Sequence, residues 1–347
     1  MPKNIRNRIM TRNQSSPSLT EPSSTSAIPV RPLFTLLYIA RLTDATASPG
    51  LPSRIYFTMQ ALAISSQSTS VNSPSSPLPG AIKYLWSLDI YCLGKSEEVF
   101  SKILDKRPKL RENLILQSKC GINNLGKTPY YDFSKDYILS SVDGILKRLK
   151  TEYLDVLLLH RPDSLVEPEE VAEAFDILKT SGKVRHFGVS NHNAMQIRLL
   201  NKYLNEPLIV NQLEISLANS SIIDEGLNVN SNTNPGPMRN FGTLEYCRLH
   251  DITLQAWSPL AGGRIVDPKI EKYRKLNITL DEYAKKYGVK KGAIVVNWLL
   301  RHPAKIQPII GTRSIQRIKH ICQSSQIKIS REEWYNLYNL VEHRKLL

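Results

Sequence analysis

The stretch "LDVLLLHRPD" (residues 154–163) gives the clearest indication of how this chain folds. It joins a short apolar run to a cluster of polar and turn-forming residues. An apolar run of this length, bounded by turn residues, is typical of a parallel strand that is buried on both faces. The polar residues that close the run would then lie at the carboxyl end of the strand.

Further runs of the same kind occur on both sides of this stretch. They are "NLILQSKCG" (residues 113–121), "VRHFGVSN" (184–191), "LIVNQLEIS" (208–216), "ITLQAWSPL" (252–260) and "IQPIIGT" (306–312). Residues 137–150 predict a helix with one apolar stripe, made by Ile138, Val142, Ile145 and Leu149. Residues 167–179 carry helix start and stop signals. This alternation predicts consecutive βα units.

The number of units favours a barrel. "SLDIY" in "WSLDIY" (residues 86–91) is interpreted as the tail of one more strand, which makes seven units, and "REEWYNLYNLVEH" predicts a final helix. No GxGxxG follows the first strand, as a doubly wound dinucleotide-binding sheet would require. We therefore predict an α/β fold, a (β/α)8 TIM-type barrel whose first βα unit is missing or aberrant.

The amino-terminal segment has a different composition. The first 88 residues contain ten Pro and sixteen Ser and show no helix or strand period. We expect residues 1–85 to be a disordered or foreign segment and residues 86–347 to form the barrel domain. A foreign segment would indicate a misread exon boundary, a frame shift or a decayed gene. The first twenty residues carry Lys and Arg and no acid, so a mitochondrial transit peptide is the weaker alternative to a cytoplasmic location.

Charge and composition limit the classes of partner. The net charge of +15 favours anionic partners, but the basic residues show no aromatic interleaving and no zinc-finger spacing, so no nucleic acid is expected. No apolar run reaches the roughly 18 residues that span a bilayer, so no membrane is expected. The four cysteines are far apart, which predicts reduced thiols, no metal site and a cytoplasmic protein. A monomer is expected.

Polar residues close the successive apolar runs. They are Tyr91, Lys119, His160, Asn191, Gln212, Ser258 and Arg313. In a parallel barrel these positions lie together at the carboxyl ends of the strands, where the active site is found. A tyrosine, a lysine and a histidine suit carbonyl reduction, because a phenol can donate the proton and a neighbouring ammonium lowers its pKa. Since no side chain supplies hydride, the set predicts a nicotinamide cofactor.

Several motifs resemble the aldo/keto reductase family, most closely its YdhF-like branch. They are "DIY", "SKCGI", "YLDVLLLHRPD", "SGKVRHFGVSN", "VNQLEIS", "AWSPLAGGR" and "PIIGTRSIQRI". They stand in family order from Asp89 to about His343, and residues 1–85 have no counterpart. The resemblance implies a (β/α)8 barrel that reduces a small aldehyde or ketone with NADPH.

The resemblance also implies roles for individual residues. Tyr91 would be the proton donor, Lys119 its partner, and His160 would orient the carbonyl. Ser190, Asn191 and Gln212 would hold the nicotinamide carboxamide, and Trp257 would line its ring. The pyrophosphate would run along Ser258, Leu260 and Arg264. The adenosine end would meet Gly311, Thr312, Arg313 and Arg317, whose charges favour the 2′-phosphate of NADPH.

One position departs from the family. The family has an aspartate five residues before the tyrosine, and this chain has Trp86 there. Lys119 therefore lacks the carboxylate that the family pairs with it, and slower turnover is expected, by about 10- to 1000-fold. Two other functions stay open, a non-catalytic NADPH-binding protein and a defective gene product. The insertion at residues 218–240 is expected to be a loop over the mouth of the barrel.

Overall fold

The computed structural model describes residues 95–124, 126, 128–229, 240–312 and 314–341, and the backbone of residues 61–63 and 84–86. The chain divides into two units, Met1–Pro32 and Leu33–Leu347, and every described residue belongs to the second. The predicted domain boundary at residue 85 stays a prediction.

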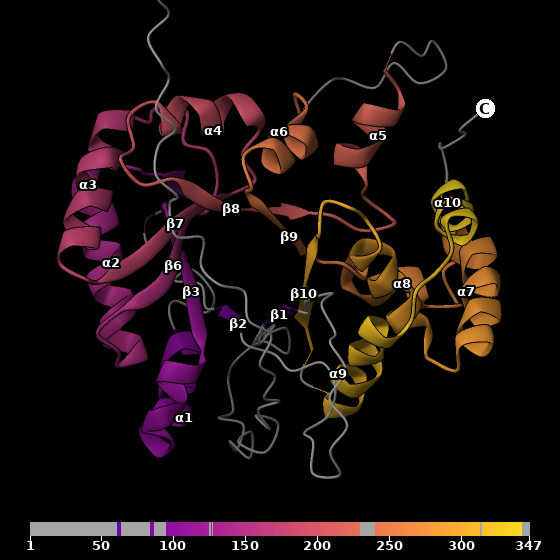
Figure 1. Ribbon diagram of the computed structural model, residues 1–347. Coiled ribbons are helices and arrows are strands. Elements are labelled where there is room, and N and C mark those ends of the chain that lie inside the picture. The colour runs from indigo at the N-terminus through magenta and orange to yellow at the C-terminus, as the bar shows by residue number, and fades with distance from the viewer. Residues whose placement is uncertain are drawn as a thin grey trace, which may run out of the picture. The chain divides into compact units, whose positions relative to one another are not determined.

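Six parallel strands form the centre of the second unit. They are β3 (Ile115–Cys120), β6 (Leu154–Leu159), β7 (Val184–Ser190), β8 (Leu208–Glu214), β9 (Thr253–Trp257) and β10 (Gln307–Gly311). Each pairs with the next in parallel register, and the sheet curls with helices on its outer side (Figure 1). All six strands lie within the predicted runs, and the predicted barrel class is confirmed.

Two short strands occupy the edges of this curled sheet. β2 (Tyr84–Trp86) pairs in parallel with β3, whereas β1 (Ala61–Ala63) pairs antiparallel with Ile309–Gly311 of β10. The first strand is therefore aberrant, as predicted, because a regular barrel of this class is parallel throughout. β1 lies inside residues 1–85, the segment predicted to be disordered or foreign. The edge of β10 presents unpaired backbone groups, which even a three-residue apolar segment can pair. The remainder of residues 1–83 lies outside the described residues.

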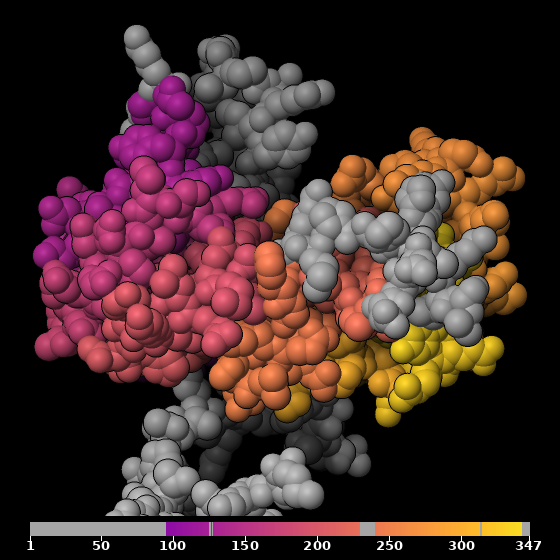
Figure 2. All heavy atoms as spheres, turned by 90° about the horizontal axis from the view of Figure 1, so that it is seen from above, coloured from indigo at the N-terminus to yellow at the C-terminus, as the bar shows by residue number. Residues whose placement is uncertain are grey.

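Helices connect the strands. They are α1 (Lys95–Lys106), α2 (Lys135–Leu149), α3 (Pro168–Thr180), α4 (Ala194–Asn201), α5 (Ser221–Leu227), α6 (Thr243–Leu249), α7 (Arg274–Tyr287), α8 (Lys291–Leu300), α9 (Ile315–Cys322) and α10 (Arg331–Asn339). Shorter elements are η2 (Pro108–Asn113), η3 (Ala261–Val266), η4 (Glu271–Tyr273), η5 (Gln323–Gln326) and the hairpin of β4 (Ile122–Asn123) and β5 (Tyr130–Tyr131). Figure 2 shows the protein from above. There the segment that holds α2 to α4, coloured magenta to salmon, lies next to the orange segment that holds α6.

The core lies between the helices and the strands. The predicted stripe of α2 is confirmed, since Ile138, Val142, Ile145 and Leu149 are all fully buried. On the neighbouring helix α3, Phe175 stacks on Phe187 of β7 with ring centroids 3.9 Å apart. Burial of each such side chain stabilises the fold by roughly 1.5–3 kcal/mol, so the outer helices hold the strands in place.

The last helix is held by a tryptophan pair. Trp298 of α8 and Trp334 of α10 stack with centroids 4.8 Å apart and planes 10° apart. Each indole N–H donates to the backbone carbonyl of the other residue, at 3.1 and 2.9 Å. A buried indole needs such an acceptor, and the pair satisfies both. Contacts of both kinds fix α10 against α8.

The insertion at residues 218–240 is only partly as predicted. It begins with α5, and Ile222 and Ile223 of this helix are buried in the core. The expectation of a loop throughout is wrong, because a pair of adjacent apolar residues gives this segment something to bury. Residues 230–239 lie outside the described residues.

Candidate active site

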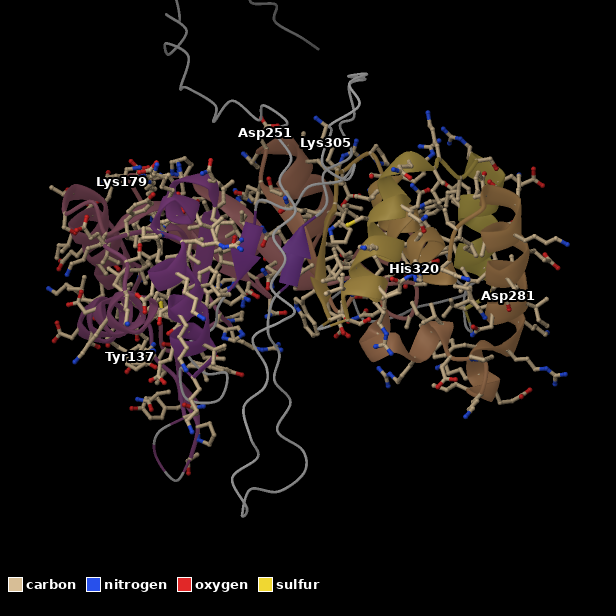
Figure 3. All side chains as sticks on the ribbon, turned by 90° about the horizontal axis from the view of Figure 1, so that it is seen from below. Tyr137, Lys179, Asp251, Asp281, Lys305 and His320 are labelled. Atoms are coloured by element: carbon tan, nitrogen blue, oxygen red, sulfur yellow. The ribbon has the colours of Figure 1, made fainter. Side chains whose placement is uncertain are left out.

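The two ends of the strands are recognisable from the residues around them. Figure 3 shows Lys179, Asp251 and Lys305 on one side, where β7, β9 and β10 begin. Tyr137 lies on the opposite side, toward the end of β3, and its hydroxyl donates to the carbonyl of Ile122. The described residues that the sequence predicts for the site belong to this second side, because they lie in the last residues of the strands or in the loops that follow them.

Lys119 and His160 meet across two neighbouring strands. Lys119 is buried near the end of β3, and His160 directly follows β6. The amide of His160 donates to the carbonyl of Cys120 at 2.9 Å, which continues the pairing of the two strands. The charge of Lys119 also acts on the His160 imidazole. The structure therefore places these two predicted residues on adjacent strand ends.

The His160 imidazole is neutral at physiological pH. Burial, together with the positive charges of Lys119 and Arg161, lowers its pKa from 6.5 to about 3. Its Nδ1 atom is buried and has no hydrogen-bond partner among the described residues. A neutral imidazole can donate or accept a hydrogen bond but has no spare proton to transfer. This position thus suits a polar reactant group that approaches the ring.

Asn191 ties three strand ends together. It has a φ of 61°, a conformation in which Asn is enriched. Its Nδ2 donates to the carbonyl of His160 at 3.1 Å and to Oγ of Ser190 at 3.0 Å, while its Oδ1 accepts from Nε1 of Trp257 at 3.2 Å. Ser190 in turn donates to the carbonyl of Gln212 at 2.9 Å. These four predicted residues form one hydrogen-bonded group beside His160.

A layer of four glutamines, one of which is Gln212 itself, adjoins this group. Gln117, Gln212, Gln255 and Gln307 come from β3, β8, β9 and β10, and their amides bond to one another. Because side chains two residues apart point to the same side of a strand, Gln117 lies below Lys119 and Gln255 below Trp257. Sequence reasoning found only Gln212. The signal for Gln117 and Gln255 was a lone amide inside an apolar run, two residues before a site residue.

The loop after β9 has an unusual backbone. Ser258, Ala261, Gly262 and Gly263 all have positive φ, and a Cβ on either glycine would meet nothing within 4 Å. The predicted residues Leu260 and Arg264 lie in or beside η3, and Nε of Arg264 donates to the carbonyl of Ala261 at 2.9 Å. The loop therefore presents backbone to open space.

This loop is held from behind by Asn277 of α7. The Nδ2 atom of this buried residue lies 3.2 and 3.4 Å from the carbonyls of Ile265 and Asp267, and 3.0 Å from that of Tyr273. Lys291 donates to its Oδ1 at 3.1 Å. Sequence reasoning missed Asn277, since a single Asn in an amphipathic helix gives no distinctive signal.

The end of β10 leads into α9. Gly311 is exposed, with open space where a Cβ would stand, and Oγ1 of Thr312 accepts from the amide of Ser314 at 3.2 Å. Ser314 caps α9 by accepting from the amide of Arg317, and the Arg317 side chain is exposed. These predicted residues share one loop at the start of a helix, a place that favours anions.

Two of the predicted residues lie outside the described residues, namely Tyr91 and Arg313. The predicted strand tail "SLDIY" falls there as well, directly after β2. Among the residues that the structure describes, no group of three or more His, Cys, Asp or Glu could hold a metal ion. No helix within the same described ranges is long and apolar enough to cross a membrane.

Comparison with known proteins places the chain among reductases. A model described as "Aldo/keto reductase family" matches residues 87–342. "Uncharacterized oxidoreductase YcsN" of Bacillus subtilis is 37% identical over 262 residues, which cover 73% of this chain and 82% of that protein. "Oxidoreductase YdhF" of Escherichia coli is 34% identical over 254 residues, which cover 72% and 79%.

A solved structure agrees with these matches. The crystal structure of an aldo/keto reductase from Klebsiella pneumoniae in complex with NADP and acetate has a TM-score of 0.60 and 25% identity. The match covers 76% of this chain and 83% of that one. The resemblance noted from the sequence motifs is confirmed.

Proposed function

The chain belongs to the aldo/keto reductase family, and on this premise we propose that it reduces an aldehyde or ketone at the expense of NADPH. The observation that carries the proposal is the half-buried, neutral His160 beside the buried Lys119. Its Nδ1, buried and without a hydrogen-bond partner among the described residues, lies at the strand ends, next to the group formed by Ser190, Asn191, Gln212 and Trp257. This arrangement suits an uncharged oxygen atom as the reacting group.

The proposed catalytic roles follow from the protonation states. With a pKa of about 3, His160 is not an acid at neutral pH, so it orients the carbonyl oxygen by a hydrogen bond. The proton for that oxygen comes from the phenol of Tyr91, which later regains one from water. Lys119 stabilises the phenolate by its charge. The hydride, which no side chain can supply, is supplied by a reduced nicotinamide when it is bound.

The residues present fit an extended dinucleotide. Oε1 of Gln212 receives no hydrogen bond from the described residues and can accept one from a carboxamide. The positive-φ loop from Ser258 to Gly263 offers backbone without obstruction to a pyrophosphate, with Leu260 and Arg264 beside it. In a nest of this kind, backbone N–H groups bind anions. Trp257 is held by Asn191 so that its ring can line the nicotinamide.

The preference for NADPH over NADH rests on the loop after β10. Gly311 and Thr312 begin this loop, and Arg317 lies one turn into α9. Together with Arg313 they would bind a 2′-phosphate by charge-assisted hydrogen bonds, for which guanidinium groups are well shaped. The basic composition of the chain is consistent with an anionic ligand.

Trp86 favours a second candidate function, a protein that binds NADPH without turnover. The family has aspartate at this position, and its loss removes a carboxylate partner of the lysine. We propose the reductase first, because the lysine and histidine positions are retained. Trp86→Asp separates the two cases, since it should raise kcat about 10-fold or more if catalysis is only weakened.

The experiment begins with a fluorescence titration of the purified chain with NADPH. A generic carbonyl, 4-nitrobenzaldehyde, is then added to the same sample, and loss of the reduced-nicotinamide absorbance is followed. Saturable binding with oxidation that Tyr91→Phe abolishes supports the reductase. Binding without oxidation supports the second candidate, and absence of binding contradicts both and favours a defective gene product.

The wider biological setting is also proposed from the sequence. We expect a monomer in the cytoplasm that acts on a small carbonyl compound. Cys120, Cys247 and Cys322 are buried and form no disulfide with one another, which is consistent with the reduced state expected of the cysteines. Burial raises the pKa of Cys247 to about 12, so this thiol is unreactive at neutral pH.

A further inference from the structure

Gln255 is the centre of the glutamine layer below the candidate site. It stands in register with Gln212 of β8 and Gln307 of β10, its neighbours in the sheet, and it faces Gln117 of β3 across the barrel. Its side chain is buried, as are those of Gln117 and Gln212. Burying an amide network in this position costs free energy unless each of its donors and acceptors forms a hydrogen bond.

The hydrogen bonds of Gln255 use its whole capacity. Its Oε1 accepts from Nε2 of Gln117 at 3.0 Å and from Nε2 of Gln212 at 2.8 Å. Its Nε2 lies 3.3 Å from Oε1 of Gln117 and 2.9 Å from Oε1 of Gln307, and donates to both. A primary amide has two donor hydrogens and two acceptor lone pairs. All four are occupied, so no single amide in the layer can turn over alone.

This saturation determines which atom Gln212 presents. If the Gln212 amide turned over, its Oε1 would face the Oε1 of Gln255, and a buried hydrogen bond would be replaced by two opposed acceptors. The Nε2 of Gln212 is thus committed to Gln255. Its Oε1 is left as an acceptor that receives nothing from the described residues.

We propose that Gln255 is a positioning residue that keeps Oε1 of Gln212 available to the carboxamide N–H of the cofactor. The inference rests on the proposed function. Gln255 lies below the group and acts only through Gln212. Its removal should therefore weaken binding of cofactors that carry an N–H donor at this place, and not of those that lack one.

The test compares two oxidised cofactors by calorimetry. NADP⁺ carries the carboxamide, and its 3-acetylpyridine analogue has a methyl ketone in place of that group and so no N–H donor. The wild-type chain should bind NADP⁺ about 3- to 10-fold more tightly than the analogue, the range of one net hydrogen bond. Gln255→Met should remove this preference, mainly by weakening the binding of NADP⁺.

Gln307→Met is the matched control, because it removes another partner of Gln255 and leaves the bond to Gln212 in place. It should keep the wild-type preference. Gln255→Glu is a second variant in case Gln255→Met does not fold. Its carboxylate still accepts from Gln212 but cannot donate to Gln307, so the preference should persist while the Tm falls.

The outcomes separate the inference from the function beneath it. A wild-type chain that binds neither compound overturns both. NADP⁺ binding with a preference that survives Gln255→Met overturns the inference alone, as does equal weakening of both compounds, which would indicate a merely structural role. Loss of the preference in Gln255→Glu would overturn it as well.

Discussion

At the amino-terminal ends of the strands, Asp155 of β6 is enclosed by partners. Arg111 and Arg185 donate to its two oxygens at 2.9 and 3.0 Å, and the amide of Leu116 donates at 2.9 Å. Both guanidinium groups also cover the ring of Tyr153, at 3.7 and 3.9 Å from its centroid. At the opposite ends, His160 is half-buried, and its buried Nδ1 has no hydrogen-bond partner in the described part of the chain.

This difference in hydrogen bonding indicates a structural role for the amino-terminal ends of the strands and a ligand-binding role for their carboxyl ends. Asp155 has both oxygens paired within the protein, which is what a structural cluster requires. His160 and Gln212 each keep an atom available, which costs stability and is expected where a ligand completes the bonding. In barrels of this class, polar residues at the strand starts stabilise, and those at the strand ends act on substrate.

The largest expected effect comes from His160→Ala. The variant should lower kcat/KM by about 10²- to 10³-fold, as loss of one hydrogen bond to a developing charge does. The free energy of unfolding should change by about 1 kcal/mol or less, because Nδ1 makes no hydrogen bond to the described residues that could be lost. Steady-state kinetics and urea unfolding of the same sample measure both. A large loss of stability would contradict the assignment of this end to function.

Asp155→Ala should have the opposite profile. It leaves two arginines and a buried amide without their acceptor, and we expect the free energy of unfolding to fall by about 3 kcal/mol. The kcat/KM of the folded fraction should be unchanged. Asp143→Ala is the control, because this exposed carboxylate pairs only with Lys183 among the residues that the structure describes. Equal effects of the two variants on the free energy of unfolding would mean that the Asp155 cluster stabilises the fold no more than an exposed ion pair does.

A half-buried histidine lies at each end of the strands, so the pH dependence of stability can be compared between the two ends. Burial lowers the pKa of His302, near the strand starts, to about 4, and that of His160 to about 3. The unfolded chain takes up these protons near pH 6.5, so between pH 6.5 and 4 it binds more protons than the folded chain. Lowering the pH through this range therefore favours unfolding.

His302→Gln should remove part of this dependence. Between pH 7 and pH 4 the variant should lose on the order of 2 kcal/mol less stability than the wild type. Protonation of His302 would also break the bond from the amide of Ala304, at 3.1 Å. Urea unfolding at several pH values measures the effect, with His320→Gln as the control. Parallel curves for His302→Gln and the wild type would contradict it.

The smallest expected effect concerns the loop after β9. Asn277→Leu removes the bonds that hold Ile265 and Asp267, and should raise the dissociation rate of NADPH about 3- to 5-fold through a more mobile loop. Stopped-flow fluorescence measures this rate. Asn205→Ala is the control, since the side-chain amide of Asn205 donates to Asp176 at 2.8 Å and bonds no other described residue. An unchanged rate in Asn277→Leu would separate the loop from cofactor release.

Much of the fold was predictable from the sequence, for a physical reason. Strands buried on both faces must be apolar, so "LDVLLL" could be identified directly, and β6 occupies these residues. β1 was not predictable, because a three-residue strand with no pattern is selected only by the free edge of β10. The helix α5 was hidden in the same way, since its burial depends on the core that receives it.

The candidate site was predictable where function and position coincide. Lys119, His160 and Asn191 close apolar runs and were found. Gln255 and Asn277 do not close a run, and their importance arises from partners distant in sequence, such as Gln117 and Ile265. Such pairings appear only when the chain is folded, so no local pattern could have indicated them.

The stacked tryptophans of α8 and α10 also make the protein its own optical reporter. Two indoles 4.8 Å apart and nearly parallel have coupled electronic transitions, which produce an exciton signal in circular dichroism. Because the partners lie 36 residues apart in the chain, the signal exists only while α10 is docked on α8. Detachment of the last helix can therefore be followed separately from the loss of helical backbone, without a label.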